Sequence, residues 1–248
     1  MPSFLAAAAA LLIGLLLGML GGGGSVLTVP TLVYLMGVPA KTAVAMSLPI
    51  VGITSLVGAV GHWRQGTVAW RQALAFGAVA MGAAFVGARL ATRLDGRTQL
   101  VLLAVLMGGT ALSMLRPQRG GDPEAPPATP PSTSRWPLAA VAVGVLTGLV
   151  GVGGGFLVVP ALVLLARVPI RRAIGTSLVV ITMNAASGLA GHLGHTAIAW
   201  GTVGWFSALA VVGIVAGTAV SPYVPIRWLR PGFAWLLLAL AALMLWQQ

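Results

Sequence analysis

The sequence has no cysteine and few charged residues: charged side chains make up 7% of its 248 residues, and only 3 of them are acidic. The lack of cysteine excludes disulfides, thiolate metal sites and cysteine nucleophiles. Soluble domains carry about a quarter charged residues, so this chain lacks the polar surface that a water-exposed globule needs. Its composition is 58% hydrophobic, and apolar runs of about 20 residues, long enough to span a bilayer, recur throughout. We expect a multi-pass membrane protein.

The formal net charge of +11 does not point to a nucleic-acid-binding protein. The basic residues lie singly or in pairs between the apolar runs, which is typical of loops retained on the cytoplasmic side of a membrane rather than of a basic groove. The expected partner is therefore the lipid bilayer, and no nucleic acid. The expected location is a bacterial inner membrane.

A proline-rich stretch, residues 116–136, divides the chain. Its composition is typical of a water-exposed linker. The sequence therefore predicts an N-terminal membrane repeat (1–115), a linker (116–136) and a C-terminal membrane repeat (137–248).

The two flanking regions repeat one another at an offset of 130 residues, as from Pro30 to Pro160. The offset also superposes glycine, histidine and tryptophan residues, which apolar composition alone does not explain. The superposed pairs include Gly21 with Gly151, Gly24 with Gly154, Ser47 with Ser177, His62 with His192, and Trp70 with Trp200.

Each half contains a glycine-broken apolar segment and then three ordinary spans. The broken segments are 3–37 and 137–167, and the spans are roughly 41–62, 71–92 and 98–115, then 171–192, 201–221 and 228–246. A broken segment that crosses the membrane once makes the halves parallel, whereas one that re-enters makes them inverted.

The distribution of basic residues favours the inverted arrangement. It gathers Arg64, Arg71, Arg116, Arg119, Arg135, Arg167, Arg171, Arg172, Arg227 and Arg230 on one side, and leaves Lys41, Arg89, Arg93 and Arg97 on the other. We therefore predict an all-α membrane protein of two inverted repeats, each a re-entrant helix pair plus three transmembrane helices. The linker is then cytoplasmic and both termini lie outside.

The glycine clusters at 21–25 and 151–155 predict helix breaks, because each glycine costs about 1 kcal/mol relative to alanine inside a helix. Non-helical backbone at membrane depth survives only in a protein interior or a watery cavity. The helix that starts after each break has unpaired N–H groups that favour an anion. We expect substrate-binding positions at Gly22, Gly23, Gly24, Ser25, Gly153, Gly154 and Gly155. The alternative, that these glycines only permit close helix packing, stays open.

The duplicated Gly-x-Gly-Gly, apolar run and proline, together with Gly175-Thr176-Ser177-Leu178, resemble the TauE/SafE sulfite exporter family. The stretch from His62 to Trp70 resembles that family's loop ending in an aspartate–tryptophan pair, although Ala69 replaces the aspartate here. The resemblance covers both halves. It implies an integral membrane permease for sulfite, thiosulfate or organosulfonates.

Further candidates lie in the helices after the broken segments. Ser47, Ser177 and Thr176 offer hydroxyls to an oxyanion, and Asn184 lies seven residues beyond Ser177, on the same helical face. Each hydroxyl has the alternative of bonding its own helix backbone. His62 and His192 are candidates for proton coupling, because the predicted spans contain no carboxylate and histidine titrates in the required range.

No enzyme, metal site or cofactor is expected. Ser187 and His192 resemble an intramembrane serine protease only superficially, since both fall on one predicted helix. The function predicted is transport of a small anion, with rocking of one half against the other. A passive anion channel and a non-transporting membrane accessory factor remain alternatives. A homodimer remains an open option.

Overall fold

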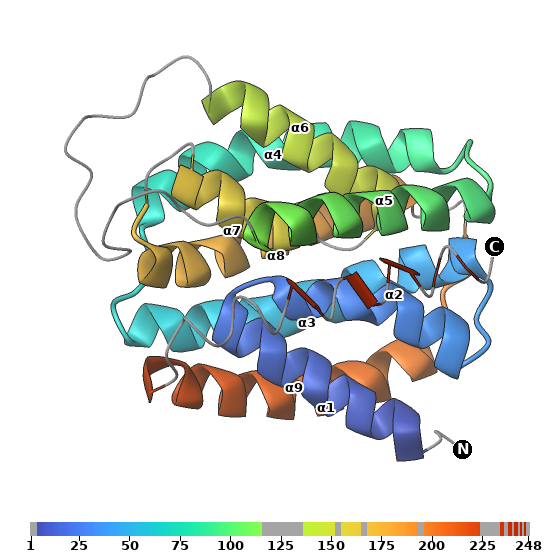
Figure 1. Ribbon diagram of the computed structural model, residues 1–248, viewed down its shortest axis with the longest axis horizontal. Helices are drawn as coiled ribbons and strands as arrows, with labels where there is room; N and C mark the ends of the chain where they lie inside the picture. Colours follow the sequence, from blue (N-terminus) through green and yellow to red (C-terminus); the bar gives the residue numbers. More distant parts are fainter. Residues whose placement is uncertain are drawn as a thin grey trace.

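The computed structural model of the chain describes residues 4–115, 136–151, 155–164, 168–192 and 196–223, with single helical positions between 234 and 246. Every regular element among these residues is helical (Figure 1). Two of the predicted site residues, Gly153 and Gly154, lie outside the described residues, as does the predicted linker apart from Trp136.

The helices follow the first five predicted spans closely, and most of the sixth, 228–246, lies outside the described residues. Their bounds are α1 (Phe4–Leu20), η1 (Gly23–Leu27), α2 (Thr28–Pro30), η2 (Thr31–Leu35), α3 (Ala40–Arg64), α4 (Trp70–Ala91), α5 (Gly96–Leu115), α6 (Trp136–Val150), α7 (Gly155–Leu164), α8 (Ile170–His192), α9 (Trp200–Val220) and η3 (Ser221–Tyr223). Helices α3, α4 and α8, and α9 together with η3, are long and apolar enough to cross a membrane.

The first helix of each half ends at its glycine cluster. Helix α1 stops at Leu20 and α6 at Val150, and the next residues, Gly21 and Gly151, have φ of 68° and 70°. Residues with a Cβ rarely adopt this left-handed conformation. The sequence-predicted helix breaks are therefore present at these two positions.

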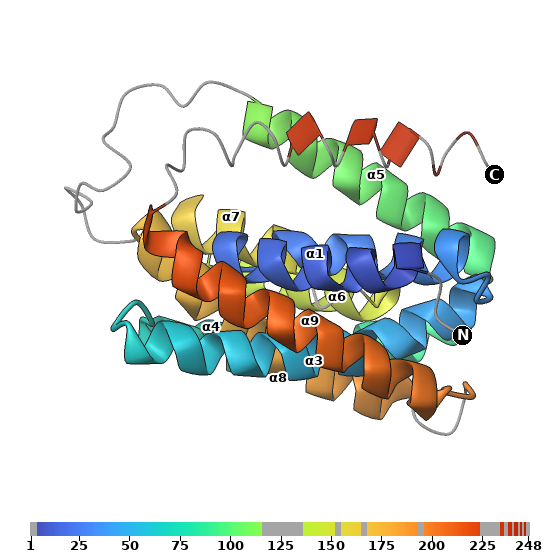
Figure 2. The ribbon, with the colours of Figure 1, turned by 90° about the horizontal axis from the view of Figure 1, so that it is seen from below.

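The halves are interlocked by packing between their helices. Helix α1 packs along α9 and α6 along α4, while α3 contacts both α8 and α9, and α8 also contacts α4. In Figures 1 and 2, α1 lies against α9 while α6 lies against α4. The first helix of each half thus packs along the second ordinary span of the other half, α4 or α9.

Small residues make these two contacts close. A Cβ atom placed on Gly18 of α1 would lie 2.6 Å from the Ile214 carbonyl oxygen of α9, and one placed on Gly148 of α6 would lie 2.6 Å from the Ala88 nitrogen of α4. Dispersion and close backbone approach drive helix association in lipid, where the hydrophobic effect is weak. Gly18 and Gly148, which precede the glycine clusters, therefore serve close helix packing.

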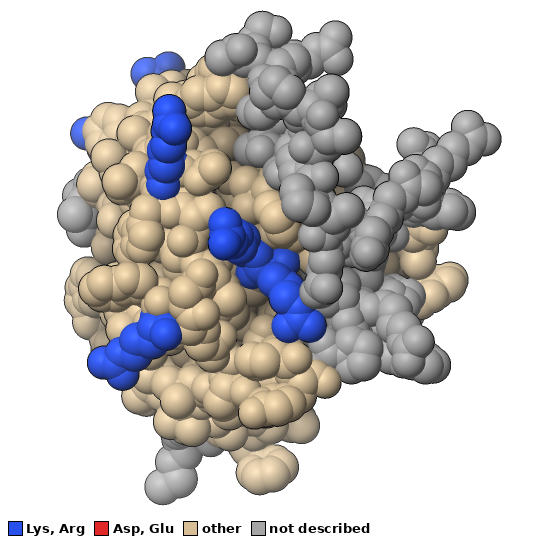
Figure 3. Space-filling model, turned by 90° about the vertical axis from the view of Figure 1, so that its left-hand side faces the viewer, with Lys and Arg blue, Asp and Glu red and all other residues tan. Residues whose placement is uncertain are grey.

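One end of the molecule brings together the end of α3 and the beginnings of α4 and α8. The Ala69 amide donates to Thr176 Oγ1 at 2.9 Å, and Gln65 Nε2 donates to the Thr218 carbonyl oxygen at 3.1 Å. Arg64, Arg71, Arg171 and Arg172 belong to these segments. Figure 3 views this end, where basic side chains stand out and no acidic side chain is visible.

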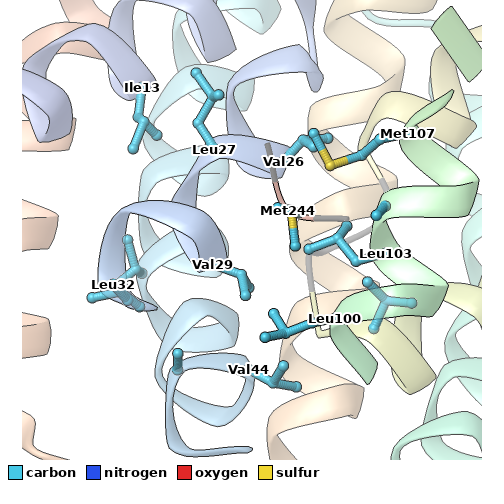
Figure 4. Packing of buried hydrophobic residues seen from close by; sticks show 14 of the residues in the cluster. Ile13, Val26, Leu27, Val29, Leu32, Val44, Leu100, Leu103, Met107 and Met244 are labelled. Atoms are coloured by element: carbon cyan, nitrogen blue, oxygen red, sulfur yellow. The ribbon is translucent and has the colours of Figure 1, made fainter. Parts of the chain in front are cut away.

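The broken segment that follows α1 is covered on its apolar side. Val26, Val29 and Leu32 join Leu103 and Met107 of α5 in a buried cluster, which Met244 of the C-terminal segment completes (Figure 4). Figure 2 shows α5 and the described C-terminal positions side by side along one edge of the molecule.

Candidate functional site

The two glycine breaks meet inside the protein. A Cβ atom placed on Gly155 would come within 2.5 Å of Gly22 Cα, and one placed on Gly22 would collide with Gly155. Gly22, Gly23, Gly24, Ser25 and Gly155 are all buried. The structure therefore brings together, without intervening side chains, the helix starts that the sequence predicted as one site.

One serine from each half holds the glycine break of the other half. Ser177 of α8 donates to the Gly21 carbonyl oxygen and shares its hydrogen with the Ile174 carbonyl at 2.7 Å. Ser47 of α3 does the same for Gly151, sharing with the Val44 carbonyl at 2.8 Å. Both side chains are 0% exposed. In this conformation the serine hydrogens hold the breaks in place, and only the oxygen lone pairs remain for another partner.

Ser25 and Thr176 are also occupied by protein groups. Ser25 Oγ donates to the Gly22 carbonyl at 2.7 Å, which closes the first turn after the break. Thr176 donates to the Arg172 carbonyl at 2.6 Å and accepts from the Ala69 amide at 2.9 Å. Thr176 thus docks the α3–α4 turn onto α8, a task the sequence analysis did not foresee.

Asn184 differs from these hydroxyls because its polar atoms have no partner. It is 0% exposed, and neither Nδ2 nor Oδ1 makes a hydrogen bond in the structure. The repeat-equivalent residue, Thr54, is satisfied by the Ile50 carbonyl at 2.6 Å. Two other fully buried hydroxyls, those of Thr28 and Ser55, also have no partner.

His62 connects the end of α3 to the end of α1. Its Nε2 lies 3.0 Å from the Gly18 carbonyl oxygen, and its Nδ1 lies 3.0 Å from Thr67 Oγ1. A carbonyl only accepts, so Nε2 carries a hydrogen. The Thr67 hydroxyl lies 3.0 Å from the His62 carbonyl, so its hydrogen can point there or to Nδ1. His62 and Thr67 can therefore keep these contacts whether the imidazole is neutral or protonated, because only the hydroxyl hydrogen of Thr67 has to turn.

His192 is arranged differently. Its Nδ1 lies 3.0 Å from the Gly188 carbonyl oxygen of its own helix. The residue that corresponds to Thr67 in the second half is Ala197, which has no hydroxyl. Sequence reasoning treated the two histidines as equivalent and missed Thr67, although this Thr/Ala difference between the halves was available as a signal.

The electrostatics of the site rest on backbone rather than on charged side chains. Lys, Arg, Asp and Glu fall only near the ends of the described helices. The first N–H groups of a helix lack intrahelical partners and carry the positive end of the helix dipole. Helix starts at Gly23 and Gly155 can therefore attract an anion weakly enough to release it.

The chain matches the sequence model of the family described as "Sulfite exporter TauE/SafE" over residues 6–244. The chain belongs to the TauE/SafE family. A probable membrane transporter protein of Xylella fastidiosa is 31% identical over 244 residues, which cover 95% of this chain and 92% of that protein. This TauE/SafE chain is therefore a multi-pass membrane protein of a transporter family, as the resemblance implied.

More distant relatives carry the same general description. The probable membrane transporter protein YdhB of Bacillus subtilis is 26% identical over 86% of this chain and 84% of its own length. A probable membrane transporter protein of Haemophilus influenzae is 28% identical over 93% of both chains. No solved structure matches the TauE/SafE chain described here.

Proposed function

We propose that this protein is a permease for a small sulfur-containing oxyanion, such as sulfite, thiosulfate or an organosulfonate, bound where the two glycine breaks meet. The observation that carries the proposal is the direct backbone contact between Gly22 and Gly155 inside the protein. Discontinuous helices at matching positions of two halves mark the binding sites of many transporters. Family membership supports the transport role. The unpaired N–H groups at the helix starts support an anion as the substrate.

An inverted arrangement of the halves is part of the proposal. The bond between the Ala69 amide and Thr176 supports it, because it puts the end of α3 beside the beginning of α8. The bond between Gln65 and the Thr218 carbonyl supports it too, because it puts the end of α9 at that same end. Equivalent helices of the two halves then run in opposite directions, as the ribbon of Figure 1 also suggests.

We also propose which end of the molecule faces the cytoplasm. The end with Arg64, Arg71, Arg171 and Arg172 is the cytoplasmic one by the positive-inside bias. Exposed Trp63 and Trp70 stack edge to face at this end, with ring centroids 5.7 Å apart, as expected of residues at a membrane interface. The predicted cytoplasmic linker, the outward termini and the inner-membrane location complete this topology.

The absence of native cysteine makes this topology easy to test. Arg71→Cys and Arg93→Cys replace exposed residues at opposite ends of α4. In intact cells a membrane-impermeant maleimide should label Cys at position 93 and not at position 71, and permeabilised cells should label both. The reverse pattern would turn the molecule around in the membrane.

We propose that His62, rather than His192, is the proton-coupling residue. The support is its double contact with Thr67 and with the Gly18 carbonyl, three residues before the break. Protonation at His62 would change the hydrogen bond that holds the end of α1, and so would influence the break directly. Gly18 and Thr67 belong to different segments, so the coupling would also reach the α3–α4 turn.

Binding by the purified protein tests the anion proposal. Sulfite, thiosulfate, sulfoacetate, taurine and sulfate should be compared by thermal stabilisation, because a ligand of the folded state raises the apparent stability. At least one sulfur oxyanion should raise the melting temperature. A well-folded sample that responds to none of them would contradict the proposal.

Counterflow in proteoliposomes separates a carrier from the two alternatives. A carrier exchanges labelled for unlabelled anion against a gradient, a passive channel does not, and an accessory factor moves no anion at all. We expect counterflow.

A further inference from the structure

Asn184 has the largest unmet hydrogen-bonding capacity of any described buried side chain. Its amide is 0% exposed, and both Nδ2 and Oδ1 lack partners. Burying an amide without hydrogen bonds is unfavourable, so the folded protein gains from a ligand that supplies them. At the equivalent position of the first half Thr54 needs no such partner, because its hydroxyl donates to the Ile50 carbonyl at 2.6 Å.

Asn184 shares a face of α8 with two residues that meet the helix starts. Ser177, Ile181 and Asn184 lie on one face of the helix, with Asn184 about 10 Å along the axis from Ser177. Ser177 contacts the Gly21 carbonyl, and Ile181 Cδ1 lies 2.8 Å from the position of a Cβ on Gly155.

Residues on the adjacent face of α8 contact α4. Met183 Sδ lies 2.6 Å from the position of a Cβ on Gly77 of α4, and Ser187 donates to the Met81 carbonyl of α4 at 2.6 Å. Asn184 lies between this α4 face and the face that meets the start of α7, one turn beyond Ile181.

An amide group demands both kinds of hydrogen-bond partner. Nδ2 donates two hydrogens, whereas Oδ1 only accepts. An anion whose polar atoms are all acceptors satisfies Nδ2 and leaves Oδ1 buried and unpaired. An anion that also carries an O–H or N–H group satisfies both atoms. Sites that read a hydroxyl in this way reject analogues that lack it.

The helix starts also limit the charge of the ligand. Each helix N-terminus acts as about +0.5 of an elementary charge, so the two starts at Gly23 and Gly155 together offset about one negative charge. No Lys or Arg lies near the middle of the described helices to offset a second one. A dianion would leave uncompensated charge in a medium of low dielectric constant.

We propose that the site selects monoanions that also carry a hydrogen-bond donor, and that Asn184 Oδ1 recognises this donor. The inference rests on the proposed function and names the substrate class of the same site. Hydrogensulfite and hydroxyl-substituted sulfonates belong to this class. Sulfate and unsubstituted alkyl sulfonates do not.

A pair of matched ligands tests whether the site recognises a hydrogen-bond donor on the anion. Isethionate and propane-1-sulfonate are monoanions of similar size that differ by a terminal hydroxyl in place of a methyl group, and sulfate is a dianion without a donor. Calorimetric titration of the purified full-length protein should show isethionate binding at least about tenfold more tightly than propane-1-sulfonate. Sulfate should bind most weakly of the three.

Two variants test whether Asn184 causes the preference for isethionate. Asn184→Leu keeps a similar volume without polar atoms and should bring the isethionate/propane-1-sulfonate ratio to about one. Thr54→Val, the matched change at the equivalent position, should keep the wild-type ratio. A monodisperse elution profile identifies folded variants, and Asn184→Ser replaces the leucine variant if the latter does not fold.

The outcomes separate this inference from the proposed function. Equal binding of both sulfonates by the wild type overturns the donor preference while the anion permease stands. Tighter binding of sulfate overturns the monoanion preference. A ratio that persists in folded Asn184→Leu overturns the role of Asn184. If neither these probes nor the anions of the binding screen bind, the proposed function itself fails.

Discussion

Ser47 and Ser177 occupy equivalent positions in the two halves of the chain, and each holds the opposite glycine break through the same pair of carbonyl contacts. His62 and His192 are also equivalent, yet one bridges α1 and the α3–α4 turn while the other bonds the Gly188 carbonyl of its own helix. Thr54 and Asn184 likewise differ, since only Thr54 is satisfied. The serine tethers are thus duplicated, whereas the surroundings of the two histidines and the hydrogen bonding at Thr54 and Asn184 differ between the halves.

This contrast has a physical reason. A tether that holds backbone must be present on both sides, because each break needs support from the opposite half. Under the proposed function, an anion or a proton needs only one chemically suitable group, which does not have to be present in both halves. The two halves can therefore diverge at such positions without loss of the shared packing.

The largest effect should come from forcing apart the two breaks, which are in backbone contact. Gly22→Val would push a side chain into Gly155, and overpacking costs about 1–3 kcal/mol. We expect loss of transport in proteoliposomes and a lower melting temperature. Gly82→Ala, at a helical glycine of α4 with open space around it, should be neutral or slightly stabilising. Normal transport by Gly22→Val would remove the breaks from the mechanism.

Replacing the histidines tests whether the halves differ in coupling. His62→Gln removes the titrating group that contacts the Gly18 carbonyl, so transport should become slower and lose its dependence on pH. His192→Gln should keep that dependence, because the position of Thr67 is taken in the second half by Ala197, which has no hydroxyl. Transport rates measured across a pH series decide the matter, and equal effects of the two changes would make the histidines equivalent after all.

The serine tethers test the symmetric part of the comparison. Ser47→Ala and Ser177→Ala each remove a buried hydroxyl that donates to a break carbonyl. Each should lower the free energy of unfolding by about 1 kcal/mol, and by similar amounts. Denaturation of the two purified variants measures this directly. A clear inequality would mean that one break is held by other contacts.

The smallest effect concerns Asp95, whose counterpart in the second half is Pro225. Hydrogen bonds from the Thr98 hydroxyl and amide hold the pKa of this exposed carboxyl below its usual value. A lowered pKa contributes stability above the unfolded-state pKa, which is lost as the pH falls through the folded-state pKa. Asp95→Asn should therefore melt slightly below the wild type at neutral pH. The difference should disappear in acid, and one that persists there would have another cause.

The spans and the helix breaks could be predicted because they follow from composition and local backbone preference. Glycine clusters are poor helix formers wherever they occur, and apolar runs of bilayer length have few other uses. The helix after the first break was not predicted in detail: it passes from 3₁₀ through α to π geometry between Gly23 and Leu35. Pro30 lacks an N–H and so cannot close a regular α-helical ladder there.

The site was harder to predict because its hydrogen bonds join residues far apart in the chain. Glycines that permit packing, such as Gly18, and glycines that break a helix, such as Gly21, look alike in the repeat. The carbonyls that occupy Ser47 and Ser177 come from the opposite half, so their availability depends on tertiary structure. Asn184 was identified from its helical register, but its lack of partners could only come from the fold.

The packing of each half's first helix against the other half has a consequence for biogenesis. While the N-terminal half is being inserted, the glycine-lined surfaces of α1 and α4 have no helix to cover them, since α9 and α6 are synthesised later. We therefore expect the early chain to wait in the bilayer as loosely associated helices that lock only when the last segments arrive. Truncated chains would then be substrates for membrane proteolysis rather than half-sized transporters.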